Sequence, residues 1–230
     1  KKQFKKVIII SNVHREFSDT ITLPEAEYFL IGDKKIKVDL DAIKILKKVG
    51  KKVRVSNIPH MEEHGIETVL PFVNYLYPEA KIIPILLGKT IVSLVRNLSN
   101  MINAIKDENT LIIISSNFSG YETEDLSKDV GELGIKLTTE GKMSDLVELS
   151  RTNKLKTCGA GAIASAILLN DYKDIKIIKH KSIGEIIPRH VEIVVGKYSM
   201  AYIYEPIACH SYNEVTIDGK QIKIATIDTI

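Results

Sequence analysis

The sequence contains no tryptophan, two glutamines and only two cysteines, Cys158 and Cys209. Two cysteines are too few for a disulfide framework, which excludes the small disulfide-rich secreted proteins and predicts a reducing, cytoplasmic setting. No uninterrupted apolar run approaches the ~20 residues of a membrane-spanning helix, and the N-terminal residues lack the apolar stretch of a signal peptide. We therefore expect a cytoplasmic protein that has no membrane partner. The scarcity of glutamine beside abundant Ile and Lys is compatible with a thermophilic source.

The sequence also lacks a large excess of charge of one sign, because it contains 32 Lys and Arg residues and 29 Asp and Glu residues, for a net charge of +3. This balance is far from the clustered positive field of a nucleic-acid binder, so we expect no nucleic-acid partner. With 44% hydrophobic and 27% charged residues, the 230-residue chain has the composition of an ordinary folded protein. It contains no internal repeat and no linker rich in Gly, Pro or Ser, which predicts a single main domain.

Short apolar runs alternate with segments of helical period over the first three quarters of the chain. The runs predict strands buried on both faces, at 6–10, 53–57, 81–87 and 111–116. The helical segments are 40–48, with Asp39 as N-cap, then 62–76, 90–106, 143–150 and 159–169. Three further strands, at 175–180, 191–195 and 198–204, predict an antiparallel portion. The expected fold is a three-layer α/β sandwich with a mixed, mostly parallel sheet flanked by helices.

The C-terminal tail alternates apolar and polar residues around Asp218-Gly219, a strong signal for a β-hairpin. An isolated two-stranded hairpin is only marginally stable, so its apolar side chains must pack against the parent sheet or a second subunit. We therefore expect a domain at 1–205 and a hairpin extension at 206–230. The extension would serve interaction or edge protection, which makes a homo-oligomer or a protein partner the expected assembly.

Two of the six histidines, His60 and His64, are four residues apart. On one helix they would share a face and could bind one metal ion. Pro59 argues against this, because it favours helix initiation here and leaves His60 outside the regular helix. A first turn rich in Glu suits the helix dipole, so this segment by itself predicts histidines that cap the helix or face solvent.

Polar residues follow the strand at 111–116, at the place where open α/β sheets form ligand crevices. Asn117 and Gly120 in this segment also suit an ordinary turn. Cys158 precedes a helix of small residues, whose positive end favours a thiolate. A nucleophile, a metal ligand and a small buried thiol are the alternatives for this cysteine.

Five blocks of the sequence, in order, resemble the Memo family, whose bacterial and archaeal members are the AmmeMemoRadiSam system protein B group. The first, Val7-Ile8-Ile9-Ile10 running into His14, resembles the family's strand that ends in Gly-Pro-Ser-His. Residues 63–72 with the strand 81–88 resemble its Glu-His-Ser-Ile-Glu block, its Leu-Pro-Phe and the strand that follows. The remaining blocks are 115–121, similar to Ser-Ser-Asp-Phe-Ser-His-Tyr, the Cys-Gly pair at 158–159, and 199–202, similar to Ser-Val-Ser-Tyr.

The resemblance implies a fold related to class III extradiol dioxygenases and an iron- or copper-binding pocket. In that pocket His14 and Cys158 would be metal ligands, and His64 would line the pocket, where it could serve as the missing third ligand. His64 and Asn117 are the catalytic candidates. Asn117 and Gly120 stand where the family has Asp and His. The family also has an earlier strand that ends in Pro-His-Ala-Gly-Tyr and carries a further ligand. That strand has no counterpart before Lys6. These departures predict a metal ion that is weakly bound or absent.

Three functions follow from these residues. The first, which the sequence favours, is a divergent, non-catalytic family member that acts by association. The second is a metal-dependent oxidoreductase that holds iron or copper with His14, His64 and Cys158 and binds dioxygen or a small molecule at an open position. The third is metal-free hydrolysis or group transfer, with Cys158 as nucleophile and a nearby histidine as base. We expect His14, His64, Asn117 and Cys158 to converge on one crevice at the carboxyl ends of neighbouring strands.

Overall fold

The computed structural model describes residues 3–16, 18–119, 124–169, 175–183, 187–195, 200–203, 212–217 and 220–225. In these residues one eight-stranded sheet forms the middle layer, and its strands run in the order β5-β2-β6-β1-β7-β10-β9-β8. The strands are β1 (Lys6–Asn12), β2 (Ile21–Leu23), β5 (Val53–Val55), β6 (Lys81–Leu87), β7 (Thr110–Ser115), β8 (Ile175–Ile183), β9 (Ile187–Val195) and β10 (Met200–Ile203).

The sheet is mixed and mostly parallel, as predicted. Strand β1 pairs in parallel with both β6 and β7, and β10 continues the parallel part beside β7. Strands β9 and β8 add an antiparallel edge, and at the other side β2 pairs antiparallel with β6 and parallel with β5. The central strands consist of β-branched and other apolar residues because helices cover both of their faces.

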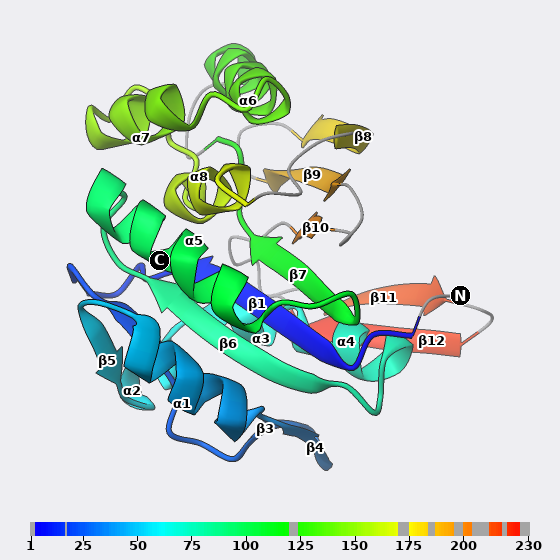
Figure 1. Cartoon of the computed structure of the whole chain (residues 1–230). Coiled ribbons are helices and arrows are strands. Elements are labelled where there is room, and N and C mark those ends of the chain that lie inside the picture. The colour runs from blue at the N-terminus through cyan, green and yellow to red at the C-terminus, as the bar shows by residue number, and fades with distance from the viewer. Residues whose placement is uncertain are drawn as a thin grey trace.

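Eight helices accompany the described part of the sheet. They are α1 (Leu40–Val49), α2 (Ile58–Glu62), α3 (His64–Glu67), α4 (Leu70–Leu76), α5 (Val92–Ile105), α6 (Glu124–Thr139), α7 (Met143–Arg151) and α8 (Ala160–Ile167). In Figure 1, α1, α5 and α8 lie in front of the sheet, whereas α3 and α4 lie behind it, which completes the predicted three layers. Asp39 caps α1 as predicted, because its carboxylate accepts the N–H of Ala42 at 3.2 Å.

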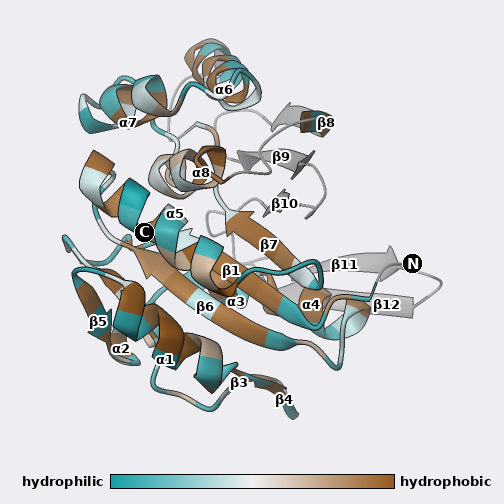
Figure 2. Cartoon of the chain, viewed as in Figure 1, coloured by the Kyte–Doolittle hydropathy of each residue, from teal (hydrophilic) through white to brown (hydrophobic). Residues whose placement is uncertain are grey.

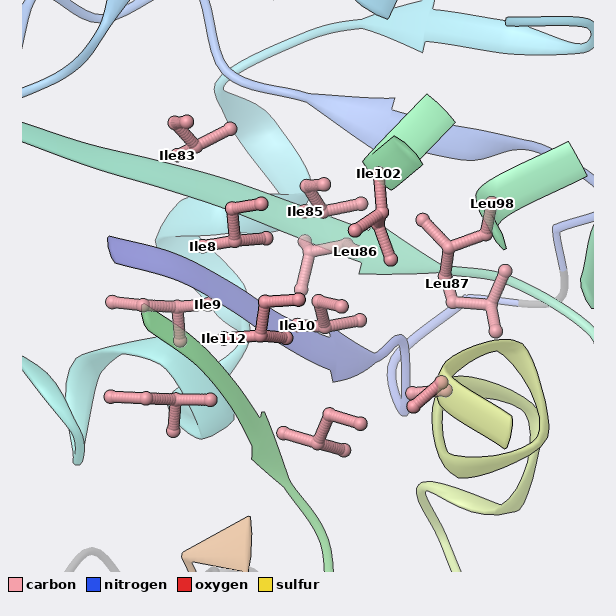
Figure 3. Packing of buried hydrophobic residues seen from close by; sticks show 14 of the residues in the cluster. Ile8, Ile9, Ile10, Ile83, Ile85, Leu86, Leu87, Leu98, Ile102 and Ile112 are labelled. Atoms are coloured by element: carbon pink, nitrogen blue, oxygen red, sulfur yellow. The ribbon is translucent and has the colours of Figure 1, made fainter. Parts of the chain in front are cut away.

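The core lies between the central strands and these helices. Ile8 and Ile10 of β1 are completely buried, as are Leu98 and Ile102 of α5, and Figure 3 shows the α5 side chains pointing toward the sheet. Figure 2 shows β1, β6 and β7 as largely hydrophobic strands. Burying one such side chain stabilises the fold by about 1.5–3 kcal/mol. The sheet is therefore a rigid base for polar residues at the ends of its strands.

The single helix predicted at 62–76 is wrong, because the segment forms three short helices, α2, α3 and α4. Glu63 adopts an extended conformation (φ −102°, ψ 130°) that ends α2 before α3 begins. Pro59 and Pro71 each lie in the first turn of a helix, where the missing N–H is not needed. The break at Glu63 matters for the site, because it turns this side chain away from a helix surface and toward the sheet.

Several elements were not predicted, namely α6, the short strand β2, and the two-stranded sheet formed by β3 (Tyr28–Ile31) and β4 (Lys34–Lys37). The α6 sequence contains Gly131 and Gly134, which lower helix propensity. A Cβ atom at Gly134 would lie 2.9 Å from the Phe118 ring, so this glycine allows α6 to approach the segment after β7 closely.

The C-terminal strands β11 (Tyr212–Ile217) and β12 (Lys220–Ala225) pair antiparallel with Tyr212 opposite Ala225. The predicted turn residues Asp218-Gly219, the residues Gly196-Lys197 between two of the predicted strands, and Cys209 lie outside the described residues. The packing of the hairpin extension and its role therefore stay predictions. None of the helices in the described ranges has the length and apolar character needed to cross a membrane.

Candidate functional site

The candidate site lies at the carboxyl ends of β1 and β7, which are neighbours in the sheet. Ile10 is paired with Ile114, so the segments that follow the two strands leave the sheet at the same edge. His14 follows β1, and Ser116 and Asn117 follow β7. This is the edge at which α/β sheets of this kind place their ligand sites.

The structure brings His14 and His64 together and adds a third residue, Glu63. The Glu63 side chain is buried, and its Oε2 atom lies 2.7 Å from Nδ1 of His14. Its Oε1 atom accepts the backbone N–H of His14 and, at 2.8 Å, that of Arg15. The His14 and His64 rings have centroids 5.1 Å apart and planes 30° apart. Glu63 thus ties the loop after β1 to the junction of α2 and α3.

These hydrogen bonds decide the charge state of Glu63. Burial alone would raise the pKa of the Glu63 carboxyl, but the bonds from the His14 imidazole and from the Arg15 and His14 backbone outweigh it and lower the pKa below its usual value of 4.5. Glu63 is therefore ionised at neutral pH and can only accept hydrogen bonds. It follows that Nδ1 of His14 is the donor, which places the lone pair of the neutral imidazole on Nε2.

The donor set of this cluster fits a metal ion. Among the residues that the structure describes, His14, Glu63 and His64 form a group whose potential ligand atoms all lie within 4.8 Å of one another. Two imidazoles and one carboxylate are a donor combination that suits zinc and non-haem iron. The sequence predicted two of the three members, and the signal for the third was the Glu63-His64 dipeptide.

Asn117 and Cys158 form a second pair and do not belong to this group. The backbone N–H of Asn117 donates to Sγ of Cys158 at 3.2 Å, and the backbone N–H of Cys158 donates to Oδ1 of Asn117 at 3.0 Å. The Gly159 N–H donates to Ser116 Oγ at 2.9 Å. These bonds fasten the segment after β7 to the beginning of α8. The convergence of this pair with His14 and His64 on one crevice stays a prediction.

Gly159 is required by this close contact. A Cβ atom at this position would lie 2.5 Å from both Cβ and Oγ of Ser116. We expect Gly159→Ala to lower the free energy of unfolding by about 1–3 kcal/mol through overpacking, as measured by urea denaturation. Adding Ser116→Gly should recover part of the loss by removing the clashing atoms, and a double variant no more stable than the single one would contradict this explanation.

His60 neither caps a helix nor faces solvent, so that prediction is wrong for this residue. Its ring packs edge-on against Phe29, with centroids 5.9 Å apart, and both ring nitrogens are buried. Burial lowers the pKa of His60 to about 4, and the nearby Arg54 guanidinium adds to this, while the Thr22 carbonyl and Glu63 oppose it. The residue is absent from the metal-capable group because α2 ends before α3 begins.

The fold and this cluster define an α/β protein with a metal-capable site at the carboxyl edge of its sheet. Comparison with known proteins identifies the family: the family model described as Memo-like protein matches residues 1–201. The chain therefore belongs to the Memo family, in agreement with the resemblance seen in the sequence.

Several curated relatives are MEMO1 family proteins of archaea. The protein of Pyrobaculum aerophilum is 26% identical over 157 residues, which cover 66% of this chain and 56% of the relative. The protein of Caldivirga maquilingensis is also 26% identical, over 73% of this chain and 61% of the relative. That of Nitrosopumilus maritimus is 25% identical over 58% of this chain and 49% of the relative. The chain thus matches only about half to three fifths of the length of these relatives.

Proposed function

We propose that this chain binds a transition-metal ion through the imidazoles of His14 and His64. The observation that supports the proposal is the grouping of His14, Glu63 and His64 within ligand distance of one another. The sequence favoured a non-catalytic protein because residues of the family motif that would bind or support a metal ion are replaced or have no counterpart, and Glu63 supplies one supporting group for His14. Its negative charge lies beside both rings and offsets the positive charge of an ion.

Glu63 acts on His14 as a positioning residue. A carboxylate that accepts the Nδ1 proton of a histidine fixes the ring and makes its Nε2 a stronger ligand. The two backbone bonds to Oε1 hold this carboxylate in place, so the orientation of His14 is set before any ion binds. A bound ion would supply Lewis acidity and, if it is iron or copper, the one-electron chemistry of an oxidoreductase.

We expect the untagged protein to bind one Fe(II), Cu(I) or Zn(II) ion per chain in anaerobic titration calorimetry. His14→Ala and His64→Ala should each remove stoichiometric binding, because each deletes one imidazole. Glu63→Gln should weaken binding by about 10-fold or more, as loss of an orienting partner does in other metal sites. The matched control is Glu62→Gln, since Glu62 is the exposed neighbour and makes no bond to His14. Thermal unfolding of each variant separates loss of binding from loss of fold.

Cys158 is assigned as a ligand by the family resemblance, and we propose it as a further ligand that the ion recruits. Cys158→Ser should then weaken binding while leaving the hydrogen bond from its backbone to Asn117 in place. Unchanged affinity in this variant would restrict the ligands to the His14, Glu63 and His64 cluster. If the wild-type protein binds none of the three ions, the metal proposal fails and association with a partner becomes the better hypothesis.

A further inference from the structure

The residues that connect β1 to β2, 13–16 and 18–20, cross over the carboxyl end of β6, because β6 lies between these two strands in the sheet. At the start of this β1–β2 crossing, the Val13 N–H donates to the Leu87 carbonyl at 2.9 Å. At its end, the Thr20 carbonyl accepts the Gly88 N–H at 3.0 Å. Both ends of the crossing are therefore fixed to the sheet, on either side of His14.

The second half of the crossing rests directly on the backbone after β6. The Ser18 carbonyl accepts the Lys89 N–H at 2.8 Å. A Cβ atom at Gly88 would lie 2.3 Å from the same carbonyl oxygen, so glycine is needed for this close approach. Lys52 of the turn before β5 adds an ion pair, with Nζ 2.7 Å from Oδ2 of Asp19. Both of these side chains are more than half exposed, and ion pairs of this kind contribute little.

Side chains from other elements hold the first half, which contains His14. Glu63 accepts the backbone N–H groups of His14 and Arg15, as described above. The Glu16 carboxylate makes an ion pair with the guanidinium of Arg54, which belongs to β5. The Arg54 and Glu16 side chains are 38% and 33% exposed, so solvent and salt screen this pair only in part. The first half of the crossing is thus held at both Glu63 and Arg54.

We infer that Arg54 is a positioning residue for His14, which it holds in place through Glu16. The inference rests on the proposed metal function, because His14 is one of the proposed ligands. Glu16 is only two residues beyond His14, so a shift of Glu16 also moves the His14 backbone. Such a shift would disturb the 2.7 Å contact between His14 Nδ1 and Glu63 Oε2, which sets the tautomer of the ring.

A positioning role and a simple charge effect predict opposite results when Arg54 is replaced. A guanidinium repels a metal cation, so a residue that acted only through its charge would weaken binding, and its removal would strengthen binding. If Arg54 positions His14 instead, its removal weakens binding even though a positive charge is lost. The direction of the change therefore separates the two roles.

We expect Arg54→Gln to weaken Zn(II) binding by the full chain about three- to tenfold in titration calorimetry, somewhat less than the loss of a group bonded directly to a ligand. The matched control is Lys52→Gln, which removes a positive charge from the second half of the crossing and should not weaken binding. Exchanging the charges, with Glu16→Arg and Arg54→Glu together, should recover part of the affinity that each single substitution loses. Unchanged or tighter binding by Arg54→Gln would overturn the inference.

A second measurement needs no metal ion. Long-range 1H–15N correlations of the histidine rings report the tautomer of His14, whose signals are assigned by their loss in His14→Ala. We expect a single tautomer with Nδ1 protonated in the wild type and in Lys52→Gln, and a mixture in Arg54→Gln and in Glu16→Gln. Thermal unfolding verifies that these variants are folded.

The two measurements keep this inference separate from the proposed function. A wild-type protein that binds no metal ion but shows the expected change of tautomer would overturn the proposed function and leave the role of Arg54 standing. A single unchanged tautomer in folded Arg54→Gln, or a mixture already present in the wild type, would overturn the role of Arg54 whether or not metal binds.

Discussion

Phe118→Ala should lower the free energy of unfolding by about 3–5 kcal/mol, the usual cost of removing a fully buried aromatic ring. Phe118 is completely buried directly after the strand that leads into the candidate site, and its ring lies beneath α6 at Gly134. Its backbone carbonyl also accepts the Thr157 hydroxyl at 3.0 Å. The cavity would therefore loosen α6 and the segment that precedes Cys158 together.

Urea denaturation at neutral pH measures this loss, and two variants bracket it. Phe118→Leu should cost less, because most of the volume is retained. Met61→Ala should change the free energy of unfolding by no more than about 0.5 kcal/mol, since Met61 is 82% exposed. A Phe118→Ala loss as small as that of Met61→Ala would show that the ring is not part of the core.

Acidification should destabilise the protein through His60 well before its carboxylates titrate. The pKa of His60 is about 4 in the folded protein and 6.5 in the unfolded chain. Above pH 6.5 the ring is neutral in both states and has no effect on stability. As the pH falls below 6.5 only the unfolded chain takes up the proton, so stability is lost down to about pH 4. The difference of 2.5 units (6.5 minus 4) corresponds to about 3 kcal/mol.

Denaturation curves at a series of pH values measure this loss, and His60→Phe isolates it. The variant keeps an aromatic ring against Phe29 but has no proton to bind, so its stability should vary less than that of the wild type between pH 6.5 and pH 4. Glu63 adds a separate loss at lower pH, because its pKa is held below 4.5 in the folded protein. Parallel curves for wild type and His60→Phe would show that His60 is protonated equally in both states.

The parts of the fold that the sequence predicted are those with a strong local signal. Strands β1 and β6 are continuous apolar runs, and α1 carries an N-cap at Asp39. The missed elements lack such a signal, because β2 has only three residues and α6 contains two glycines. The break between α2 and α3 was missed because apolar spacing continues across Glu63, where the backbone turns to satisfy distant partners.

The candidate site was predictable only in part for a similar reason. His14 and His64 were identified through family resemblance, and no local pattern links them. Glu63 bonds to residues 48 and 49 positions away, so its role depends on the finished fold. The burial of His60 likewise depends on a residue distant in the sequence, Phe29, and a short polar segment with two histidines carries no sign of this contact.

The position of β1 in the sheet also determines when the fold can form during synthesis. Its first residue pairs with Lys81 on one side and Thr110 on the other. Until those strands leave the ribosome, the run from Val7 to Ile10 is an apolar strand with two open edges, which is the kind of segment that aggregates or recruits chaperones. Such non-local pairing also predicts slow refolding in vitro. His14 can meet Glu63 early, but the sheet that supports them closes only after β7 has been made.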